Sequence, residues 1–364
     1  MKVLVVDDSV VFRSQIKSAL KSHPEFTDID VAANGKIAIG KLEQSSYDLV
    51  VLDIEMPEMN GIETLKEMKK LGINAKTIVF SSLTARGAKH TMEALEHGAC
   101  DFITKPQALN DFELALQHVK DELIPKALQF LGKSNLQAEM KLAANAPTPS
   151  PSTFSPPSNK PNTRWLTHNV NQFMPNICVV GSSTGGPMAL RDLFSTIRGP
   201  LKYPILITQH MPPVFTKTLA KSIADQTGLP AKEAKHFEEL QNEIYVAPGD
   251  FHLTLKKSND KVFTVLDKRP KRNSVRPAVD FLFESVAEIY GRTTLGIVLT
   301  GMGSDGADGA VAIKNKNGCI VIQDENTSTV WGMPGAVHRV GAFDQMSSIQ
   351  ECAKIFAKLI GTNQ

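Results

Sequence analysis

The chain of 364 residues is too long for one ordinary domain of roughly 150 residues, so its length predicts two or three domains. Its composition, 42% hydrophobic and 21% charged, is typical of a soluble globular protein with substantial cores. The four cysteines form no CxxC pair, which excludes a disulfide scaffold and a zinc ribbon and favours a cytoplasmic location. Carboxylates at Asp7 and Asp8 interrupt the first apolar run, so we expect neither a signal peptide nor a membrane-spanning helix.

The net charge of +2 is the sum of the charges of two parts of the chain that have opposite sign. Residues 1–130 contain 15 basic and 19 acidic residues, a net charge of −4, whereas residues 131–364 contain 25 and 19, a net charge of +6. We therefore expect an acidic part and a basic part, with the basic part suited to hold both its acidic neighbour and acidic partners.

A proline-rich stretch divides the chain. Six prolines occur within residues 147–161, and serine and threonine occupy most of the other positions. Because proline lacks a backbone donor and fixes φ, the stretch favours an extended linker over a helix or a strand. The predicted organisation is a domain at 1–130, a helix end and linker at 131–175, and a second domain at 176–364.

Short apolar runs alternate with amphipathic helical patterns in both parts of the chain. Before the linker the runs are residues 3–6, 28–33, 49–52, 77–80 and 101–103, and the last helical pattern covers 112–131. After it they are residues 177–180, 205–208, 243–247, 295–299 and 319–322. This alternation predicts the α/β class, with two doubly wound parallel-sheet domains: a five-stranded one, then a Rossmann-like one.

Polar residues follow the predicted strands of the first domain. Asp7 and Asp8 end the first strand, Asp53 ends the third, Ser81 ends the fourth, and Lys105 follows the fifth. The carboxyl ends of parallel strands meet at one edge of a sheet, where clustered carboxylates repel unless a cation joins them. Oxygen ligands suit Mg²⁺, which would also neutralise a phosphoryl group arriving at Asp53. A solvated strand end accounts for one such aspartate but not for the whole set.

With these residues, the segment Leu-Asp-Ile-Glu-Met-Pro-Glu-Met-Asn-Gly around Asp53 and the pair Lys105-Pro106 make the first domain resemble the receiver domain of two-component response regulators. The resemblance implies that a histidine kinase supplies a phosphoryl group to Asp53. It also implies a Mg²⁺ site formed by Asp7, Asp8, Asp53 and the carbonyl of Glu55. The implied switch positions are Ser81, Phe102 and Lys105. Phenylalanine at 102 lacks only the ring hydroxyl of the tyrosine found in the family.

A serine follows the first predicted strand of the second domain. The pattern Gly181-x-Ser183-x-Gly185 permits a sharp strand-to-helix turn that exposes a serine hydroxyl. Serine needs a base to act as a nucleophile, and His210 ends the next strand. Asp305 follows a later strand and could orient the imidazole. Each residue alone has an ordinary structural explanation, as a helix cap or a hydrogen-bonded rim histidine, but their shared position at strand ends favours a Ser-His-Asp triad.

Two alternatives arise from the same region. The order Ser…His…Asp excludes the α/β-hydrolase superfamily, in which the order is Ser…Asp…His. The run Gly301-Met302-Gly303-Ser304-Asp305-Gly306, followed by Asp324, matches the local dinucleotide-binding fingerprint. That fingerprint normally lies at the start of a domain, whereas here it lies near the end of one. NAD binding would also leave Ser183 and His210 unexplained.

Several segments of the second domain together resemble the protein-glutamate methylesterase/glutaminase family of bacterial chemotaxis (CheB type). They are Gly-Ser-Ser-Thr-Gly-Gly at 181–186, Gln-His-Met-Pro-Pro at 209–213, Ala-Pro-Gly-Asp at 247–250, Ser-Val-Arg-Pro-Ala-Val-Asp at 274–280, Leu-Thr-Gly-Met-Gly-Ser-Asp-Gly at 299–306 and Trp-Gly-Met-Pro-Gly at 331–335. The resemblance implies a cofactor-free triad of Ser183, His210 and Asp305, with Thr184 and Met302 near the oxyanion. Serine at 182, where the family commonly has alanine, places two adjacent hydroxyls in the turn.

The expected partners are chemoreceptors as substrate and a histidine kinase as phosphodonor, with no nucleic acid and no membrane insertion. We expect the acidic receiver to rest on the basic domain and shield its site until Asp53 is phosphorylated. The basic run at 268–272 with Arg276 is either a solvated loop or a surface that steers acidic receptor helices. A DNA-binding regulator is disfavoured because no compact helix-turn-helix is evident, and a non-enzymatic adaptor is the remaining rival.

Overall fold

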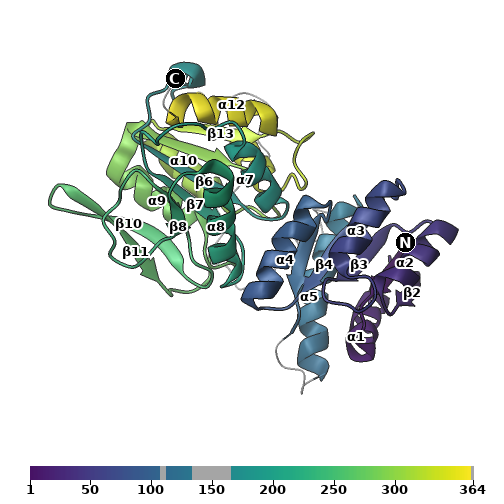
Figure 1. Ribbon diagram of the computed structural model, residues 1–364. Coiled ribbons are helices and arrows are strands. Elements are labelled where there is room, and N and C mark those ends of the chain that lie inside the picture. Colours follow the sequence, from purple (N-terminus) through teal and green to yellow (C-terminus); the bar gives the residue numbers. More distant parts are fainter. Residues whose placement is uncertain (107–111, 133–164, 362–364) are drawn as a thin grey trace, which may run out of the picture.

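The computed structural model describes residues 1–106, 112–132 and 165–361, which form two α/β lobes (Figure 1). The predicted linker falls mostly on residues 133–164, outside the described residues. None of the helices in the described part of the chain is both long and apolar enough to span a membrane.

The first lobe is built on a five-stranded parallel sheet, as predicted. Its strands lie in the order β2-β1-β3-β4-β5, the doubly wound order that sequence alternation favours. The central strand β3 is buried at every position, so its apolar run packs against helices on both faces. The strands are β1 Lys2–Val6, β2 Asp28–Ala32, β3 Leu49–Asp53, β4 Lys76–Ser81 and β5 Asp101–Thr104.

The helices of this lobe begin at short polar caps. Ser9, Asn34 and Thr84 each accept a hydrogen bond from a backbone N–H of the first turn, and Asn60 forms a full capping box with Glu63. These caps fix where each βα loop ends, and therefore the sheet edge at which Asp7 and Asp53 lie. The helices are α1 Val10–Lys21, α2 Gly35–Gln44, α3 Gly61–Lys70, α4 Ala85–Glu96 and α5 Phe112–Phe130.

The second lobe contains a seven-stranded sheet in which every pairing is parallel, in the order β14-β13-β12-β6-β7-β9-β8. The five predicted strands are all present, and two short edge strands were missed because their sequences, Ala-Lys-Glu and Gln-Met-Ser, contain no apolar run. The predicted α/β class is thus confirmed for both lobes. The strands are β6 Ile177–Ser182, β7 Ile205–Gln209, β8 Ala231–Glu233, β9 Ile244–Val246, β12 Thr294–Val298, β13 Cys319–Gln323 and β14 Gln345–Ser347.

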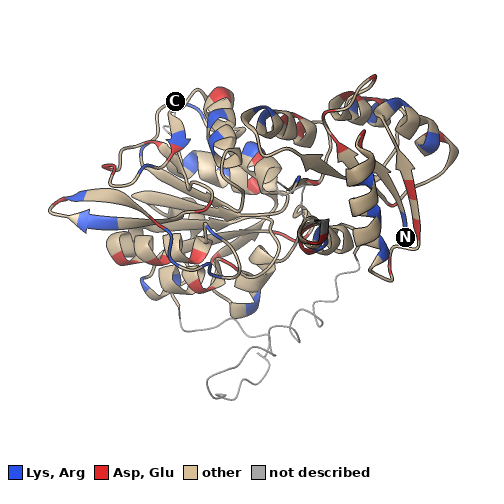
Figure 2. Cartoon of the chain, turned by 90° about the horizontal axis from the view of Figure 1, so that it is seen from below, with Lys and Arg blue, Asp and Glu red and all other residues tan. Residues whose placement is uncertain are grey.

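Helices cover both faces of this sheet (Figure 1). The longer ones are α7 Gly186–Phe194, α8 Phe215–Thr227, α9 Val279–Tyr290, α10 Ala307–Asn315, α11 Met333–Val340 and α12 Ile349–Ile360. Two 3₁₀ turns, η1 Val170–Gln172 and η2 Gly291–Thr293, complete the set. An antiparallel hairpin of β10 His252–Ser258 and β11 Lys261–Asp267 projects from the sheet, with basic residues near its tip (Figure 2).

The first residues after position 164 belong structurally to the second lobe, although the sequence places them in the linker. The indole Nε1 of Trp165 donates to Asn315 at 2.9 Å, and the backbone N–H of His168 donates to Asp344 at 2.8 Å. These two contacts attach Trp165 and His168 to the second lobe.

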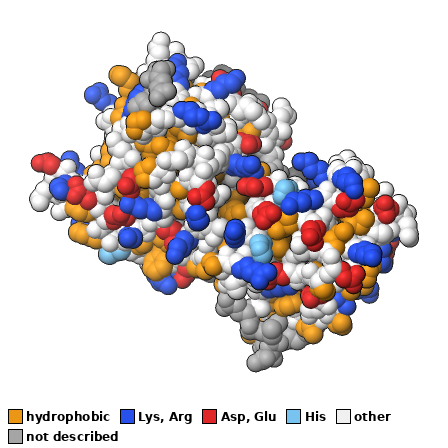
Figure 3. Space-filling view, viewed as in Figure 1, with side chains coloured by type: hydrophobic (Ala, Val, Ile, Leu, Met, Phe, Trp, Pro, Cys, Tyr) orange, Lys and Arg blue, Asp and Glu red, His pale blue; other side chains and the backbone are white. Residues whose placement is uncertain are grey.

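The two lobes meet through an apolar contact. Helix α4 packs against α7 and α8, and the ring of Phe102 stacks on that of Phe215 with centroids 4.6 Å apart and planes 6° from parallel. Among the described residues one ion pair, Glu96 with Arg191 at 3.4 Å, joins the lobes, and charged side chains surround the junction (Figure 3). The described contact between the lobes thus combines an aromatic stack with a single ion pair.

A buried ion pair anchors the start of the second domain. Nζ of Lys314 lies 2.6 Å from Oδ1 of Asp344 and donates to the carbonyl of Leu166 at 2.7 Å, and the side chains of the pair are 2% and 0% exposed. Removing one partner of such a pair leaves an uncompensated buried charge, which is more costly than losing the pair itself.

We expect Lys314→Met to lower the free energy of unfolding of this domain by about 3–5 kcal/mol, because the Asp344 carboxylate loses its cation. Both tryptophans, Trp165 and Trp331, lie in the second domain, so tryptophan fluorescence during urea unfolding of the full chain reports on it. Lys221→Met is the control, since the Lys221–Asp225 pair is 74% and 65% exposed and should change little. Equal effects of the two substitutions would contradict the prediction.

Candidate active site and phosphoacceptor site

Both lobes place their candidate residues at the point where the strand order reverses. In the first sheet this point lies between β1 and β3, which carry Asp7 and Asp53 at their carboxyl ends. In the second it lies between β6 and β12, which lead into Ser183 and into the loop that carries Asp305. Crevices at such points are where doubly wound proteins bind their ligands.

A sharp turn after β6 carries Ser183. Gly185 has φ +75°, in the left-handed region that favours glycine, and helix α7 starts at the next residue. On the opposite wall, a Cβ at Gly301 would lie 2.8 Å from the Cβ of Ser183, so only glycine allows the loop after β12 to approach the serine this closely. The sequence pattern around Ser183 thus forms the predicted strand-to-helix turn.

The two adjacent hydroxyls of this turn have different surroundings. Ser182 is fully buried and its Oγ donates to Oε1 of Gln209 at 2.6 Å, while Nε2 of Gln209 donates to the carbonyl of Ser183 at 2.8 Å. Ser183 borders a cavity, and its hydroxyl has no hydrogen-bond partner within the described residues. Ser182 therefore holds the turn in place, and Ser183 is the hydroxyl available to a ligand.

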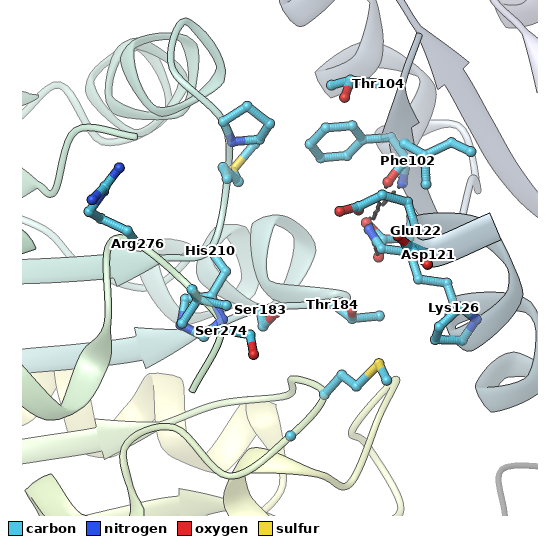
Figure 4. Close-up of a pocket in the computed structure, with 18 of the residues that line it drawn as sticks. Phe102, Thr104, Asp121, Glu122, Lys126, Ser183, Thr184, His210, Ser274 and Arg276 are labelled. Atoms are coloured by element: carbon cyan, nitrogen blue, oxygen red, sulfur yellow. Dashed lines mark hydrogen bonds and ion pairs between the residues drawn. The ribbon is translucent and has the colours of Figure 1, made fainter. Parts of the chain in front are cut away.

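His210 and Asp305 form a close pair beside Ser183. Nε2 of His210 lies 2.7 Å from Oδ2 of Asp305. Because Ser182 pairs with Gln209 across β6 and β7, the next residue on each strand, Ser183 and His210, lies at the same sheet edge and on the same cavity (Figure 4). No hydrogen bond joins Ser183 and His210 among the described residues, as is common before a substrate binds.

The Asp305 carboxylate is buried but surrounded by donors. Oδ2 accepts from the backbone N–H of Val279 at 2.6 Å, and Oδ1 accepts from Asp280 N at 3.1 Å and from Nδ2 of Asn273 at 3.1 Å. Burial raises the pKa of Asp305, but the hydrogen bond with His210 and those from the start of α9 outweigh it and bring the pKa below its usual range. The carboxylate is therefore ionised at neutral pH and can only accept.

A cavity of about 690 Å³ connects this pair to the receiver lobe. One wall carries Ser183, Thr184, His210 and Met302, and the other is formed by β5 and α5 of the receiver, including Glu122 (Figure 4). The backbone N–H groups of Thr184 and Met302 donate no hydrogen bond within the described residues, so both are available to an incoming oxyanion. The structure thus brings four of the five predicted active-site residues to one cavity, and the fifth, Asp305, lies behind His210 and bonds it.

The predicted carboxylate cluster is also present in the receiver lobe. Oxygen atoms of Asp7, Asp8 and Asp53 all lie within 4.8 Å of one another, and this oxygen-only donor set fits a hard divalent cation. Nζ of Lys105 lies 3.1 Å from Asp7 and 2.8 Å from Asp53. The side chain of Glu55 pairs with Arg86 at 3.2 Å, outside the cluster, so only its backbone is a candidate ligand.

Burial and the adjacent Asp7 carboxylate raise the pKa of Asp53 to about 6, although Lys105 opposes this shift. Burial likewise raises the pKa of Asp7. Two buried carboxylates so close together repel each other, and a further cation in the cluster would relieve that repulsion.

The predicted switch positions lie between the phosphoacceptor and the second lobe. Ser81, at the end of β4, is buried and accepts a hydrogen bond from Thr91 of α4 at 2.7 Å. Phe102, on β5, is the residue that stacks on Phe215 of the second lobe. The sequence did not indicate that this aromatic position is itself the contact between domains, because its partner is 113 residues away along the chain.

The basic run is largely neutralised by neighbouring carboxylates, which disfavours its interpretation as a steering surface. Lys268 and Arg276 both pair with Asp250, and Arg269 pairs with Asp267. Within the described residues Lys271 has no ion pair, and it lies at the rim of the cavity. One free cation is a weak source of long-range attraction.

Two residues that touch Asp305 were not predicted from the sequence. The side-chain amide of Asn273 and the backbone N–H of Asp280 both donate to the Asp305 carboxylate, yet neither residue lies at the end of a strand. Asp280 belongs to the segment Arg-Pro-Ala-Val-Asp that matched the family, which was the available signal. Its carboxylate accepts from Gly306 N at 2.9 Å and Gly309 N at 2.8 Å, so it occupies the helix N-terminus that a pyrophosphate would need, and the NAD alternative is disfavoured.

Comparison with known proteins agrees with this arrangement. The family model described as CheB methylesterase matches residues 178–356, and the response regulator receiver domain model matches residues 3–117. A protein-glutamate methylesterase/protein-glutamine glutaminase of Trichodesmium erythraeum is 38% identical over 361 residues, covering 99% of each chain. One of the same name from Thermotoga maritima is 40% identical over 345 residues and 94% of each chain.

The chain belongs to this methylesterase family. It is an enzyme of the ester hydrolase class with a response regulator receiver, which confirms the class predicted from sequence and excludes a DNA-binding regulator. The crystal structure of the Thermotoga maritima CheB methylesterase catalytic domain is 43% identical, covers 51% of this chain and 98% of that one, and gives a TM-score of 0.49.

A buried histidine supports the segment before α9 in this methylesterase. Nδ1 of His252 accepts from the backbone N–H of Ala278 at 3.2 Å, and Nε2 contacts the carbonyl of Pro270 at 3.2 Å, so the ring is neutral with its hydrogen on Nε2. Burial lowers the pKa of His252, and the nearby guanidinium groups of Arg269 and Arg276 act in the same direction. Protonation would remove the acceptor at Nδ1.

We expect the second domain to lose stability as the pH falls from about 6.5 towards the lower folded-state pKa of His252, because the unfolded chain binds the proton more tightly. His252→Gln, which cannot titrate, should flatten this part of the curve of unfolding free energy against pH, measured by urea titration. His236→Gln is the control, as His236 is exposed and lies in the same domain. The same slope in His252→Gln and wild type would contradict the prediction.

Proposed function

We propose that this chain hydrolyses glutamate methyl esters on chemoreceptor helices in the cytoplasm, and deamidates glutamines of the same helices, as part of chemotactic adaptation. The observation that carries the proposal is the ionised Asp305 carboxylate bonded to His210 beside the unpartnered Ser183 hydroxyl. The names of the relatives support the substrate class.

The first half of the reaction is acylation of the serine. Because Asp305 can only accept, Nε2 of His210 donates to it, and Nδ1 is the nitrogen left to take the Ser183 proton. Oγ of Ser183 forms a bond to the ester carbonyl carbon, and the N–H groups of Thr184 and Met302 stabilise the oxyanion. Methanol then leaves with the proton from His210, and an acyl-enzyme remains.

The second half reverses these roles. His210 removes a proton from water, the hydroxide attacks the acyl carbon, and Ser183 leaves with the proton from His210. The product is a glutamate carboxylate. Glutamine follows the same course, with ammonia leaving in place of methanol. The esterase chemistry needs no cofactor, since every proton transfer is assigned to His210.

We expect Ser183→Ala to abolish methanol release from methylated receptor membranes, and Ser182→Ala to retain most of it, because only the first removes the hydroxyl that faces the cavity. A fluorophosphonate reagent should label wild type and Ser182→Ala but not Ser183→Ala. Methanol release by Ser183→Ala would refute the triad, and a wild-type chain that neither labels nor releases methanol would favour the adaptor alternative.

For the receiver we propose phosphorylation of Asp53 by a histidine kinase, with Mg²⁺ held by Asp8, Asp53 and the Glu55 carbonyl, and with Asp7 nearby. The fit of the three carboxylates to a divalent cation supports this assignment. When bound, the ion would neutralise charge on the phosphoryl group. Lys105 already pairs with the Asp53 carboxylate and would follow it as its charge increases.

We further propose that the unphosphorylated receiver restricts access to Ser183. The cavity is walled on one side by β5 and α5, and the stack of Phe102 on Phe215 holds that wall in place. Ser81 and Lys105 connect Asp53 to β4, α4 and β5, so phosphorylation would shift the equilibrium towards a form in which this contact is open.

We expect Phe102→Ala to raise methylesterase activity of the unphosphorylated full-length protein. A stacked pair contributes about 0.5–1.5 kcal/mol beyond the area it buries, so its loss should shift the closed-to-open ratio by about two- to tenfold. The measurement is receptor methyl-ester hydrolysis with and without a small phosphodonor, and the phosphodonor should stimulate Phe102→Ala less than wild type.

Ile37→Ala, on helix α2 at the far edge of the receiver, is the control and should behave as wild type. Deletion of residues 1–140 should raise basal activity in the same way. If Phe102→Ala lowered the activity of both forms, the receiver would act by direct activation instead of by restricting access.

A further inference from the structure

The buried aspartate Asp280 has an arrangement that a helix cap does not explain. It is the second residue of α9, where a carboxylate would ordinarily serve its own helix, and it is 1% exposed. Its Oδ1 instead accepts from Gly306 and Gly309, at the start of α10. Asp305, one residue before Gly306, in turn accepts from Val279 and Asp280 at the start of α9. The two aspartates thus cap each other's helices.

The second oxygen of Asp280 reaches the same cluster by another route. Nδ2 of Asn273 lies 2.9 Å from Oδ2 of Asp280 and 3.1 Å from Oδ1 of Asp305, so one amide group bridges the two carboxylates. Nε of Arg272 lies 3.4 Å from Oδ2 of Asp280 and supplies a positive charge. The guanidinium also contacts Glu284 at 2.8 Å and, at the surface, the exposed Asp308 at 3.1 Å.

A tight turn presents the bridging amide. Asn273 and Ser274 have φ +52° and +65°, and the backbone groups of Arg272 and Val275 bond to each other on either side of them. Two consecutive left-handed residues are the pattern of a type I′ turn, in which asparagine is favoured at the first position. Ser274 borders the cavity close to His210 (Figure 4). Strained backbone of this kind is concentrated at functional sites.

We infer that Asp280, together with Asn273, is a positioning residue of the esterase reaction, which fixes the Asp305 carboxylate at the distance and angle that His210 requires. The hydrogen bonds of the Asp280 carboxylate run to Gly306 and Gly309, which follow Asp305 in the chain, and to Asn273, which also bonds Asp305, while Arg272 supplies an ion pair. This inference rests on the proposed triad, since it assigns a role through Asp305. It goes beyond the triad because, among the described residues, Asp280 neither lines the cavity nor bonds His210.

The groups around Asp280 change the pKa of its carboxyl group. Burial and the negative charge of Asp305 raise the pKa of Asp280, while the backbone N–H of Gly309 and the guanidinium of Arg272 oppose the shift. A second carboxylate beside Asp305 is therefore unfavourable in itself. A fold that needed only a filled helix start could use a neutral cap, as Ser9, Asn34 and Thr84 do elsewhere in the chain.

The test measures kcat and KM for methyl-ester hydrolysis in the full-length protein with saturating phosphodonor. Fluorophosphonate labelling carried to completion counts competent Ser183 sites, so that kcat is expressed per labelled serine. We expect Asp280→Ala and Asn273→Ala to lower this kcat with KM unchanged, by up to about 10²-fold for Asp280→Ala, because a displaced Asp305 misplaces His210. Asp280→Asn, which keeps one oxygen for Gly306 and Gly309, should lose less.

Asp308→Ala is the matched control. Asp308 contacts the same guanidinium and starts the same helix, but it is exposed and does not touch Asp305, so its kcat should remain that of wild type. The inference would be overturned if both alanine variants kept the wild-type kcat per labelled serine. This includes the case in which a variant loses total activity only because fewer of its serines become labelled. If Asp280→Ala fails to fold, Asn273→Ala decides, since Asn273 lies on an exposed turn.

Failure of this inference is distinguishable from failure of the proposed function. Activity that survives Ser183→Ala would refute the triad whatever Asp280 does. Activity that requires Ser183 but does not respond to Asp280 or Asn273 would refute only the positioning role.

Discussion

A carboxylate that stays ionised inside a protein must be surrounded by donors, and this requirement determines the structure of the second domain around Asp305. Four donors reach its two oxygens: a ring nitrogen, an amide and two backbone N–H groups from the start of α9. These donors come from three segments of the chain. Strand β7, the 272–275 turn and helix α9 therefore have to converge on one point, and the cavity forms where they do.

The two domains share one architecture, and each places a polar cluster at the same point in it. Each is a parallel sheet whose strand order reverses once, and each uses the crevice at the reversal for a polar cluster. In the receiver the crevice gathers carboxylates and one lysine, a surface suited to a cation and a phosphoryl group. In the second domain it gathers one hydroxyl, one imidazole and one carboxylate, which suits nucleophilic chemistry. The different side chains, rather than the fold, separate the two functions.

Much of this could be predicted from sequence, because strand-end residues in a parallel sheet are brought together by topology alone. Asp53, Ser183 and His210 all lie where the alternation of apolar runs places them. Asn273 and Asp280 could not be found this way, since their role depends on how a turn and two helices pack in three dimensions. The stack of Phe102 on Phe215 was equally inaccessible, because the linker between the domains carries no information on how they meet. Charge arithmetic suggested an electrostatic contact, and the aromatic pair shows an apolar one.

The burial of Phe102 limits which proteins can bind the receiver. The receiver face that carries α4 and Phe102 of β5 lies against the second domain, with Phe102 only 5% exposed. A surface covered in this way is not open to a second protein at the same time. Any partner that recognises this face therefore competes with the chain's own second domain, and its apparent affinity is reduced by the fraction of molecules in which the two lobes are apart.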